Sequence, residues 1–309
     1  MTQTAVSIDA RPPARAQRRR LSEGAAAILF LAPSTLLAAT FILYPILNTF
    51  AMSLFRVDQF GRFKAFRGLA NYLGLATDPN FTAALWRTVV WTAAVVIVTT
   101  VISLFLAVML NGRFRGRALA RGLLLLPWAT GLVIVGLLWR WMAQPDFGAL
   151  GHLVTTLHIT DQRLEWLAKP NLAFPLMVWI AIWASIPPTT LMLLAGLQSI
   201  ERDLYEAAAL DGARGFVVFR DFTLPLLRPV LAVSILLNVV FVFNSFPIIW
   251  TMTEGGPAGA TDTLVTYLYK LGFKLYNVGS AAAVAIVIFL ILLAFAIVHT
   301  RLMWRNVLR

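Results

Sequence analysis

Residues 206–225 read EAAALDGARGFVVFRDFTLP and lie between two long apolar runs of the chain. Asp203 and Glu206 stand near the start of a predicted helix, where the positive end of the helix dipole stabilises acidic side chains. The three alanines that follow favour helix strongly. Gly212 favours a turn at the end of this helix, and Pro225 is tolerated in the first turn of the apolar helix that comes next. The stretch therefore predicts a helix, a turn and a second short helix, displayed between two hydrophobic segments.

The composition of the chain is that of a protein embedded in a lipid bilayer. Of its 309 residues, 59% are hydrophobic and 13% are charged, whereas soluble domains carry about 25% charged residues. A membrane-spanning helix needs about 20 mostly apolar residues. Six stretches meet this requirement: Ala25–Phe50, Ala84–Leu110, Leu123–Ala143, Leu172–Leu197, Leu226–Met252 and Ser280–Trp304. We therefore predict an all-α membrane protein with six transmembrane helices, a basic tail over residues 1–24, a transmembrane domain over residues 25–309 and an exposed loop over about residues 199–225.

The distribution of basic residues predicts the orientation of these helices. Sixteen of the 26 Lys and Arg residues fall on the side of the membrane that would hold both termini. Because short cytoplasmic segments carry an excess of Lys and Arg, both termini and the 199–225 loop are predicted to be cytoplasmic. The net charge of +12 is better explained by this topology than by nucleic-acid binding, since the arginines lie beside membrane ends and do not alternate with aromatic residues on one soluble face.

Three segments between the predicted spans face the outer side: Ser53–Phe81, Gln144–Pro170 and Thr253–Asn277. Ser53–Phe81 is interrupted by Gly61, Gly68 and Gly74, which predicts a loop with one short helix. Leu264–Phe273 has the amphipathic pattern of a helix that lies at the membrane interface. Prolines within or near the spans predict bends, which membrane helices tolerate where neighbouring groups satisfy the backbone.

Several classes of function lack the residues they require. The sequence holds no GxxxxGK[ST] string, so it has no P-loop to bind nucleotide phosphates, and its lack of cysteine excludes disulfides and thiolate metal sites. His152, His158 and His299 have no carboxylate at metal-ligand spacing, so no metal site is predicted. No ionisable residue lies near the middle of a predicted span, which weakens the case for a proton or sodium relay. No plausible catalytic set is present, and we predict that the chain is not an enzyme.

The spacing within the opening stretch also resembles a family signature. EAA at residues 206–208, Gly212 after three residues, and FTLP at residues 222–225 after nine more resemble the motif EAA-x3-G-x9-I-x-LP of the permease subunits of bacterial ABC importers. Only Phe222 departs from the pattern, and it is apolar like the isoleucine it replaces. In that family the loop docks in a cleft of the ATPase subunit. The resemblance therefore implies a coupling role for the following residues: Glu206, Ala207, Ala208 and Gly212, with Asp211 and Arg214 as flanking contacts.

Three further strings resemble the carbohydrate-uptake members of that family, which include maltose, trehalose and glycerol-phosphate permeases: YPILNTFAMSLF (44–55), LPWATGLVIVGLLWRWM (126–142) and FNSFPIIWTMTEGGP (243–257). The resemblance implies the six-span fold of type I ABC importer permeases and a multi-pass location in the bacterial inner membrane. It also implies a second homologous permease as a heterodimer partner, two ATPase subunits that hold ATP and Mg, and a periplasmic or lipid-anchored solute-binding protein. No cofactor or metal is expected on this chain. Arg87 and Gly131 depart from residues common among relatives, Asn and Pro, and Gly131 leaves open whether the third span is bent.

Candidate substrate contacts lie on the fourth and fifth spans. Transporters bind solutes near the membrane midplane, between bent helices that carry a few polar groups. Asn238, Phe241 and Ser245 share one face of the fifth span at helical spacing, and Asn244 lies beside them. The fourth span offers Trp183, Ser185, Thr189 and Thr190 near Pro187–Pro188. The resemblance implies that the sugar site uses these parts of the two spans. The alternative is that Asn and Ser here hold helices together.

Two functions remain open at this stage. The first is a permease subunit of an ATP-driven importer for a sugar, sugar derivative or polyol. The alternative is a stand-alone secondary transporter or channel, in which residues 201–225 are an interfacial connector. Glu206→Lys separates the two, because only the importer would lose an ATPase partner. Whether the solute is neutral or anionic is also open, since Arg56, Arg62, Lys64 and Arg67 lie on the outer side.

Overall fold

A computed structural model describes residues 23–112, 114–158 and 163–307. Nearly all of the predicted basic tail lies outside these residues. The chain divides into two compact units, residues 1–48 and 49–309.

The first unit is helical over its described residues. α1 (Glu23–Ala38) continues through a π-helical turn, η1 (Ala39–Leu43), into α2 (Tyr44–Ser53), whose last residues belong to the second unit. The amide of Tyr44 donates to the carbonyl of Ala39, five residues back. Pro45 follows directly, and a proline ring clashes with the carbonyl four residues before it. A turn widened by one residue relieves this clash, so the predicted bend at Pro45 takes the form of a π turn.

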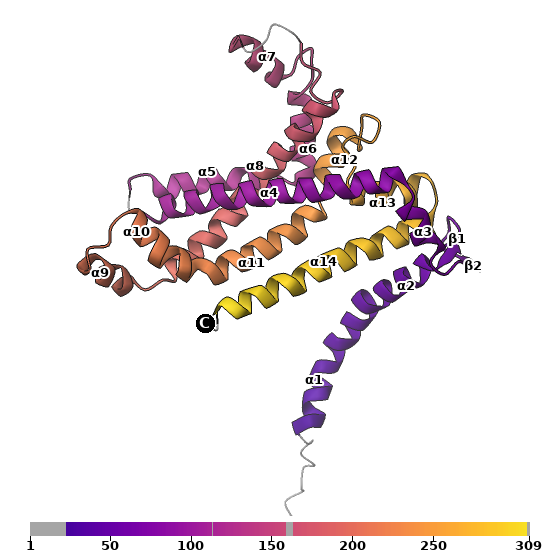
Figure 1. Cartoon of the computed structure of the whole chain (residues 1–309), viewed down its shortest axis with the longest axis horizontal. Helices are drawn as coiled ribbons and strands as arrows, with labels where there is room; N and C mark the ends of the chain where they lie inside the picture. Colours follow the sequence, from indigo (N-terminus) through magenta and orange to yellow (C-terminus); the bar gives the residue numbers. More distant parts are fainter. Residues whose placement is uncertain (1–22, 113, 159–162, 308–309) are drawn as a thin grey trace, which may run out of the picture. The chain divides into compact units, whose positions relative to one another are not determined.

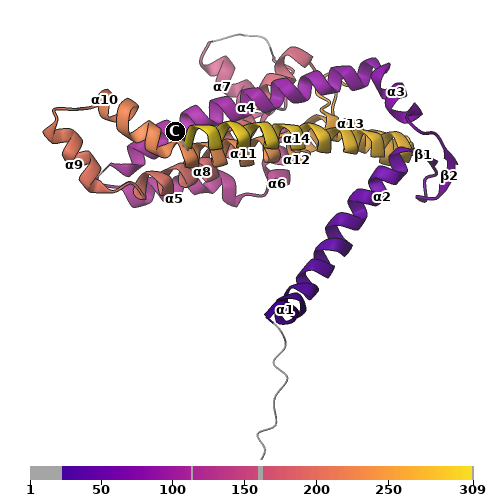
Figure 2. The ribbon, with the colours of Figure 1, turned by 60° about the horizontal axis from the view of Figure 1, so that its bottom comes forward.

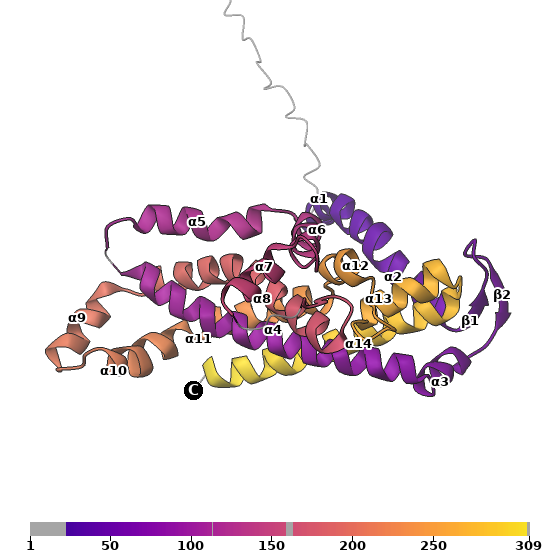
Figure 3. The same cartoon turned by 90° about the horizontal axis from the view of Figure 1, so that it is seen from above.

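Four long helices form the body of the second unit: α4 (Pro79–Asn111), α8 (Pro170–Gln198), α11 (Leu224–Phe243) and α14 (Val278–Val307). α4 packs along α8, and α11 packs against α4, α8 and α14, as Figures 1 and 3 show from two directions. Each is long enough to cross the hydrocarbon core of about 30 Å at 1.5 Å per residue. These helices confirm the predicted apolar helices in these parts of the chain. α8 runs on through Pro187 and Pro188 without ending.

The predicted third span is two helices. α5 (Arg117–Ala129) and α6 (Leu132–Met142) meet at an angle of 89°. Thr130 and Gly131 have extended backbone angles and join them. The described residues thus contain five helices that are long and apolar enough to span a membrane, or six if the bent pair forms one span.

The predicted fifth span is also interrupted. α11 ends at Phe243, and α12 (Pro247–Thr253) begins after three residues. Pro247 lacks an amide proton and its ring would clash with the Phe243 carbonyl, so α11 cannot continue through it unchanged.

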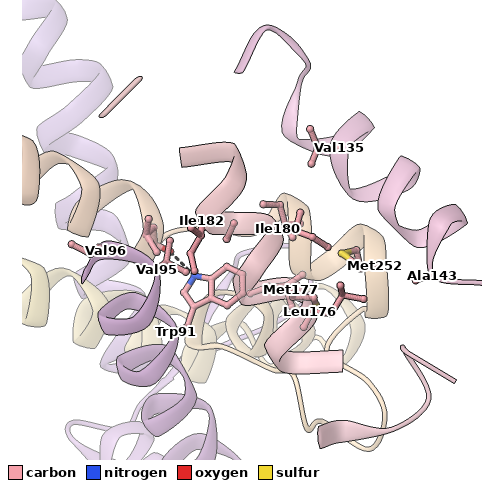
Figure 4. Packing of buried hydrophobic residues seen from close by; sticks show 14 residues of the cluster. Trp91, Val95, Val96, Val135, Ala143, Leu176, Met177, Ile180, Ile182 and Met252 are labelled. Carbon is pink, nitrogen blue, oxygen red and sulfur yellow. Dashed lines mark hydrogen bonds between the residues drawn. The ribbon is translucent and has the colours of Figure 1, made fainter. Parts of the chain in front are cut away.

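The centre of the second unit is apolar. Trp91 of α4 is fully buried, and its indole Nε1 donates to the Val242 carbonyl at 3.1 Å. Met177 and Ile180 of α8 are buried in the same cluster (Figure 4). Such contacts stabilise the bundle by close packing, which replaces the hydrophobic effect as the main attraction between helices in lipid.

The outer segment differs from its prediction at Ser53–Phe81. The short helix is present as α3 (Ala70–Ala76), but a β-hairpin precedes it, with β1 (Phe55–Val57) antiparallel to β2 (Phe63–Phe66). Asp58 Oδ1 accepts the amides of Phe60 and Arg62 and so fixes the turn. An aspartate that accepts backbone amides in this way is a known turn signal, so the sequence could have indicated the hairpin. The prediction of a loop over this part of the segment was wrong.

The predicted interfacial helix at Leu264–Phe273 instead buries one face in the protein. α13 (Leu264–Tyr269) continues into a π turn, η3 (Lys270–Lys274), and it packs against α4 and α14. The Tyr267 hydroxyl donates to Asp78 Oδ2 at 2.6 Å and lowers the pKa of that carboxyl. Asp78 caps α4 through the Asn80 amide, so this pair ties α13 to the start of α4. A short helix, α7 (Ala149–Thr156), follows α6.

Gly131→Pro should keep the fold and raise the free energy of unfolding by about 0.4–1 kcal/mol, because proline restricts the unfolded chain. Gly131 has φ −58°, which suits proline, and Thr130 before it is already extended, as a residue before proline prefers. A Cβ at residue 131 meets no atom within 4 Å. The measurement is the thermal midpoint of the purified chain in one detergent.

Gly136→Ala is the matched control. A Cβ at Gly136 would overlap the Thr251 hydroxyl where α6 crosses α12, so this variant should lower the midpoint. A lower midpoint for Gly131→Pro as well would contradict the bend at residues 130–131.

Candidate functional site

A cavity of about 560 Å³ lies beside the bend between α5 and α6. Its walls come from α5, α6, α8 and α11 and from the residues that join the first two. The lining residues are Trp128, Thr130, Gly131, Leu132, Ala184, Ser185, Pro188, Thr189, Met192, Ser234, Leu237, Asn238, Val240 and Phe241. A concave, mostly apolar space with a few polar groups is the usual form of a small-molecule site.

The polar part of the wall is a hydrogen-bonded pair across α8 and α11. Asn238 Nδ2 donates to Thr189 Oγ1 at 3.0 Å and to the Ser234 carbonyl at 3.1 Å. Thr189 Oγ1 lies 2.8 Å from the Ser185 carbonyl and 3.3 Å from Asn238 Oδ1, and its one proton is best placed for the nearer Ser185 carbonyl. Asn238 Oδ1 therefore keeps acceptor capacity that a ligand hydroxyl can use. Asn238 thus joins two helices and also presents a polar atom to the cavity.

The rest of the wall is neutral. The side chains of Trp128 and Phe241 are 60% and 58% exposed, so each presents aromatic surface. None of the residues that line the cavity is charged. This wall offers aromatic faces, an amide and hydroxyls, groups that suit an uncharged ligand rich in hydroxyls.

The structure brings together four of the predicted substrate contacts. Asn238, Phe241 and Ser185 line the cavity, as does Thr189. Ser245 and Asn244 do not line it, because α11 ends at Phe243 and the helical spacing from Asn238 stops there.

The candidates Asn244, Trp183 and Thr190 make other contacts or are buried. Asn244 Nδ2 donates to the Val240 carbonyl at 2.8 Å. Trp183 packs edge-on against Trp139, with ring centroids 5.8 Å apart, beside the apolar core. Thr190 is fully buried and does not line the cavity.

Sequence reasoning missed the wall contributed by Trp128 and Thr130. These residues were assigned to a single apolar span, in which no feature favoured one face. The Thr130–Gly131 pair inside an apolar run was the available signal, because glycine there can mark a break.

The stretch at residues 206–225 forms the predicted helix, turn and helix. α9 (Arg202–Leu210) is followed by α10 (Phe216–Val218), a π turn η2 (Phe219–Thr223), and α11. α9 and α10 lie at one end of the second unit, with α3 and the hairpin at the other (Figures 1 and 2). As at Pro45, the π turn directly precedes a proline: the Leu224 amide donates to Phe219, and Pro225 follows.

Gly212 ends α9 in a specific hydrogen-bonded turn. Its φ is +81°, in the left-handed region. The Gly212 amide donates to Ala209 and the Ala213 amide donates to Ala208, at 3.1 and 2.9 Å. This is the Schellman arrangement, which glycine favours. A second glycine, Gly215, has φ +56° and was not singled out by sequence reasoning.

The coupling candidates do not all face outward. Glu206, Ala207, Asp211 and Arg214 are exposed, whereas Ala208 is 1% exposed and faces the protein. A polar cavity of about 670 Å³ lies beside Glu206, between α9 and the ends of α4 and α8. Asn111, Gln198 and Arg202 contribute polar groups to it. In the part of the chain that the structure describes, no three His, Asp or Glu side chains converge to hold a metal ion.

Comparison with known proteins gives concordant matches. Residues 99–303 match the family described as "Binding-protein-dependent transport system inner membrane component". A probable ABC transporter permease protein of Brucella suis biovar 1 is 43% identical over 274 residues, which cover 89% of this chain and 95% of the relative. The trehalose/maltose transport system permease protein MalF of Thermococcus litoralis is 37% identical over 276 residues, 88% of this chain and 92% of that protein. The sn-glycerol-3-phosphate transport system permease protein UgpA of Yersinia pestis is 32% identical over 280 residues, which cover 90% of this chain and 94% of that protein.

Solved structures with a similar fold include a bacterial ABC transporter involved in the import of the acidic polysaccharide alginate, with a TM-score of 0.80, 21% sequence identity, and coverage of 91% of this chain and 95% of the solved chain. The matched family region contains α5, the bend, α8, α9 and α11, so both the cavity and the coupling candidates lie within it.

Gly212→Ala should loosen the end of α9, because a left-handed conformation costs an L-residue about 1–2 kcal/mol. The expected result is faster amide exchange in α9 and easier proteolysis near residue 212, with the thermal midpoint of the whole chain little changed. Gly122→Ala is the control: Gly122 lies within α5 with no atom within 4 Å of an added Cβ. Alanine is favoured over glycine inside a helix by about 1 kcal/mol, so exchange there should slow. Equal protection of α9 in Gly212→Ala and the parent would show that the turn is not held as described.

Proposed function

Because this chain belongs to the family of binding-protein-dependent transport system inner membrane components, the permeases of ABC importers, we propose that it is one permease subunit of an ATP-driven importer. It carries a sugar, sugar derivative or polyol across the bacterial inner membrane. The observation that supports this most directly is one continuous run of helix, from Phe216 through η2 and α11, that joins the coupling end to the wall of the cavity. The topology proposed is six spans with both termini in the cytoplasm.

The substrate class follows from two kinds of support. The names of the relatives refer to trehalose and maltose in one case and sn-glycerol 3-phosphate in another. The cavity wall in this chain presents Asn238 Oδ1, hydroxyls and the rings of Trp128 and Phe241. This composition favours an uncharged, hydroxyl-rich solute for the half of the path that this chain lines.

The basic residues of the outer hairpin fit a different role. Arg56 lies on β1 and Lys64 on β2, and Lys64 pairs with Asp58 at 3.2 Å. Neither lines the cavity. We assign them to docking of the solute-binding protein, where exposed charges steer association more than they add affinity.

The partners proposed are a second homologous permease, two ATPase subunits and an external binding protein. ATP and Mg are held by the ATPase subunits, since this sequence has no P-loop. This chain performs no hydrolysis. Glu206, Ala207, Asp211 and Arg214 form the exposed surface offered to an ATPase subunit, and Gly212 sets its shape.

The proposed mechanism links the two ends of α11. Closure of the ATPase dimer on ATP moves α9, and the helical run from Phe216 through η2 and α11 carries that movement over about 40 Å. The α8–α11 wall then shifts against α5, and the cavity opens to the outer side to receive solute from the binding protein. Differential binding of the ATPase dimer to the two conformations supplies the driving force. No observation favours the stand-alone transporter or channel.

Glu206→Lys should abolish recovery of the ATPase. The tagged chain is expressed with its neighbouring genes, purified in mild detergent, and its partners are identified by mass spectrometry. Reversal of a charge at a polar contact costs about 2–5 kcal/mol, so ATPase recovery should fall at least tenfold while the second permease remains. Glu165→Lys, the same change on the exposed outer segment, is the control and should retain both partners. Purification of the unaltered chain alone and folded would refute the importer.

Asn238→Ala should reduce uptake of the transported solute, tested with radiolabelled trehalose, maltose and glycerol in proteoliposomes that hold the whole complex. Loss of a neutral hydrogen bond worth about 0.5–1.5 kcal/mol should raise the solute concentration at half-maximal uptake by up to about tenfold. Asn244→Ala removes the same side chain outside the cavity and should change half-saturation less than twofold. If the two variants changed half-saturation equally, Asn238 would not be a substrate contact.

A further inference from the structure

α9 is held to the rest of the unit by very few contacts. In the part of the chain that the structure describes, it packs along no other helix. Leu210 is 90% exposed, and Ala208 is the one fully buried residue of α9. Among the described residues, α9 makes one side-chain hydrogen bond, from Tyr205. Apart from its covalent links through residues 199–201 and 211–215, α9 has, within the described chain, only these few contacts through which a force on its exposed face can reach the bundle.

The Tyr205 contact is well placed to carry such a force. Its hydroxyl lies 3.3 Å from Thr223 Oγ1, and Thr223 Oγ1 lies 3.3 Å from the Val218 carbonyl. If Thr223 donates to Val218, its oxygen is free to accept the proton of Tyr205, so all these groups are satisfied. Thr223 is 8% exposed, and a hydrogen bond shielded from water counts for more than one at the surface.

The surroundings of the ring are open. Tyr205 lines the polar cavity beside Glu206 and also a second cavity of about 300 Å³ between α9 and η2. Val218 and Phe219 line the second cavity. With space on both sides, the ring is not wedged in place by packing. The hydroxyl contact is therefore the specific tie between α9 and η2.

Thr223 lies at the junction of η2 and α11, where a displacement of α9 would be passed to α11. It is the last residue of η2, and Leu224 begins α11. A π turn has a longer hydrogen-bond register than the helix it interrupts, so the helix at this point can change its bend without breaking. Asn238 and Phe241, further along α11, line the large cavity.

From this geometry we propose that Tyr205 is a positioning residue that transmits movement of α9 to α11 through the hydroxyl of Thr223. The inference rests on the proposed function, in that it needs an ATPase subunit to move α9. It assigns the link to one hydroxyl pair and not to the backbone turn through Gly212 alone. Tyr205 does not line the large cavity beside the α5–α6 bend.

Tyr205→Phe tests the link, because it removes the hydroxyl and keeps the ring. The lack of native cysteine allows two spin labels to be placed across the cavity in the whole complex, at Leu126→Cys on α5 and Leu237→Cys on α11. Distances between them are measured with and without ATP plus vanadate, along with ATP hydrolysis and ATPase recovery. In Tyr205→Phe the ratio of shifted to unshifted populations should fall about three- to tenfold, while ATPase recovery and hydrolysis stay within twofold.

Matched variants separate the link from a structural role. Thr223→Val should lower the ratio of shifted to unshifted populations as Tyr205→Phe does, and Thr223→Ser should keep the parental ratio. The double variant Tyr205→Phe with Thr223→Val should lower the ratio no further than either single variant, since both substitutions remove the same interaction. Tyr276→Phe, at an exposed tyrosine on the outer side, should behave as the parent.

The outcomes also separate the two proposals. If the parent recovers no ATPase, or shows no distance change with ATP, the importer itself fails. If the parent responds and Tyr205→Phe responds equally, the importer stands and the Tyr205 link is overturned. The link is likewise overturned if Tyr205→Phe lowers ATPase recovery and thermal midpoint while each assembled complex keeps the parental population ratio.

Discussion

The constraint on which this structure depends is that a backbone in lipid must satisfy its own hydrogen bonds. Long helices meet it, and the chain departs from regular helix at few places within its apolar segments. Before Pro45 and Pro225 the helix widens by one residue and continues. At residues 130–131 and 244–246 it breaks. The first break forms part of the cavity wall, where solvent or solute can satisfy the freed groups.

The same constraint allows α11 to pass a displacement from the α9 end of the unit to the cavity wall. Because the helix from Phe216 onward continues through η2 without a break, a displacement at one end can be passed to the other. One end meets α9 and the other presents Asn238 to the cavity. Close approach of α8 and α11 at Gly196, where an added Cβ would meet Leu227 and Val230, keeps the two helices of the wall in register. A chain with no nucleotide site can in this way respond to one on a partner.

The sequence predicts the elements that local physics controls and misses those set by tertiary contacts. The long apolar helices α4, α8 and α14 and the turn at Gly212 depend on composition and on one backbone conformation, and these predictions are confirmed, whereas the predicted third and fifth spans are interrupted. Ser245 was assigned to a helical face that ends before it, although Pro247 could have marked the end. Trp128 reaches the cavity only because α5 and α6 meet at 89°. The pairing of Asn238 with Thr189 depends on the packing of α8 on α11, which no local pattern encodes.

The most direct test is which side of the membrane the cavity faces as the nucleotide state changes. A single cysteine at Phe241 is labelled with an impermeant maleimide from either side of proteoliposomes that hold the assembled complex, with Ile97→Cys on the exposed face of α4 as control. We predict labelling from the cytoplasmic side without nucleotide and from the outer side with ATP plus vanadate, and no switch at residue 97. Labelling of residue 241 from the same side in both states would contradict an ATP-driven path through this cavity.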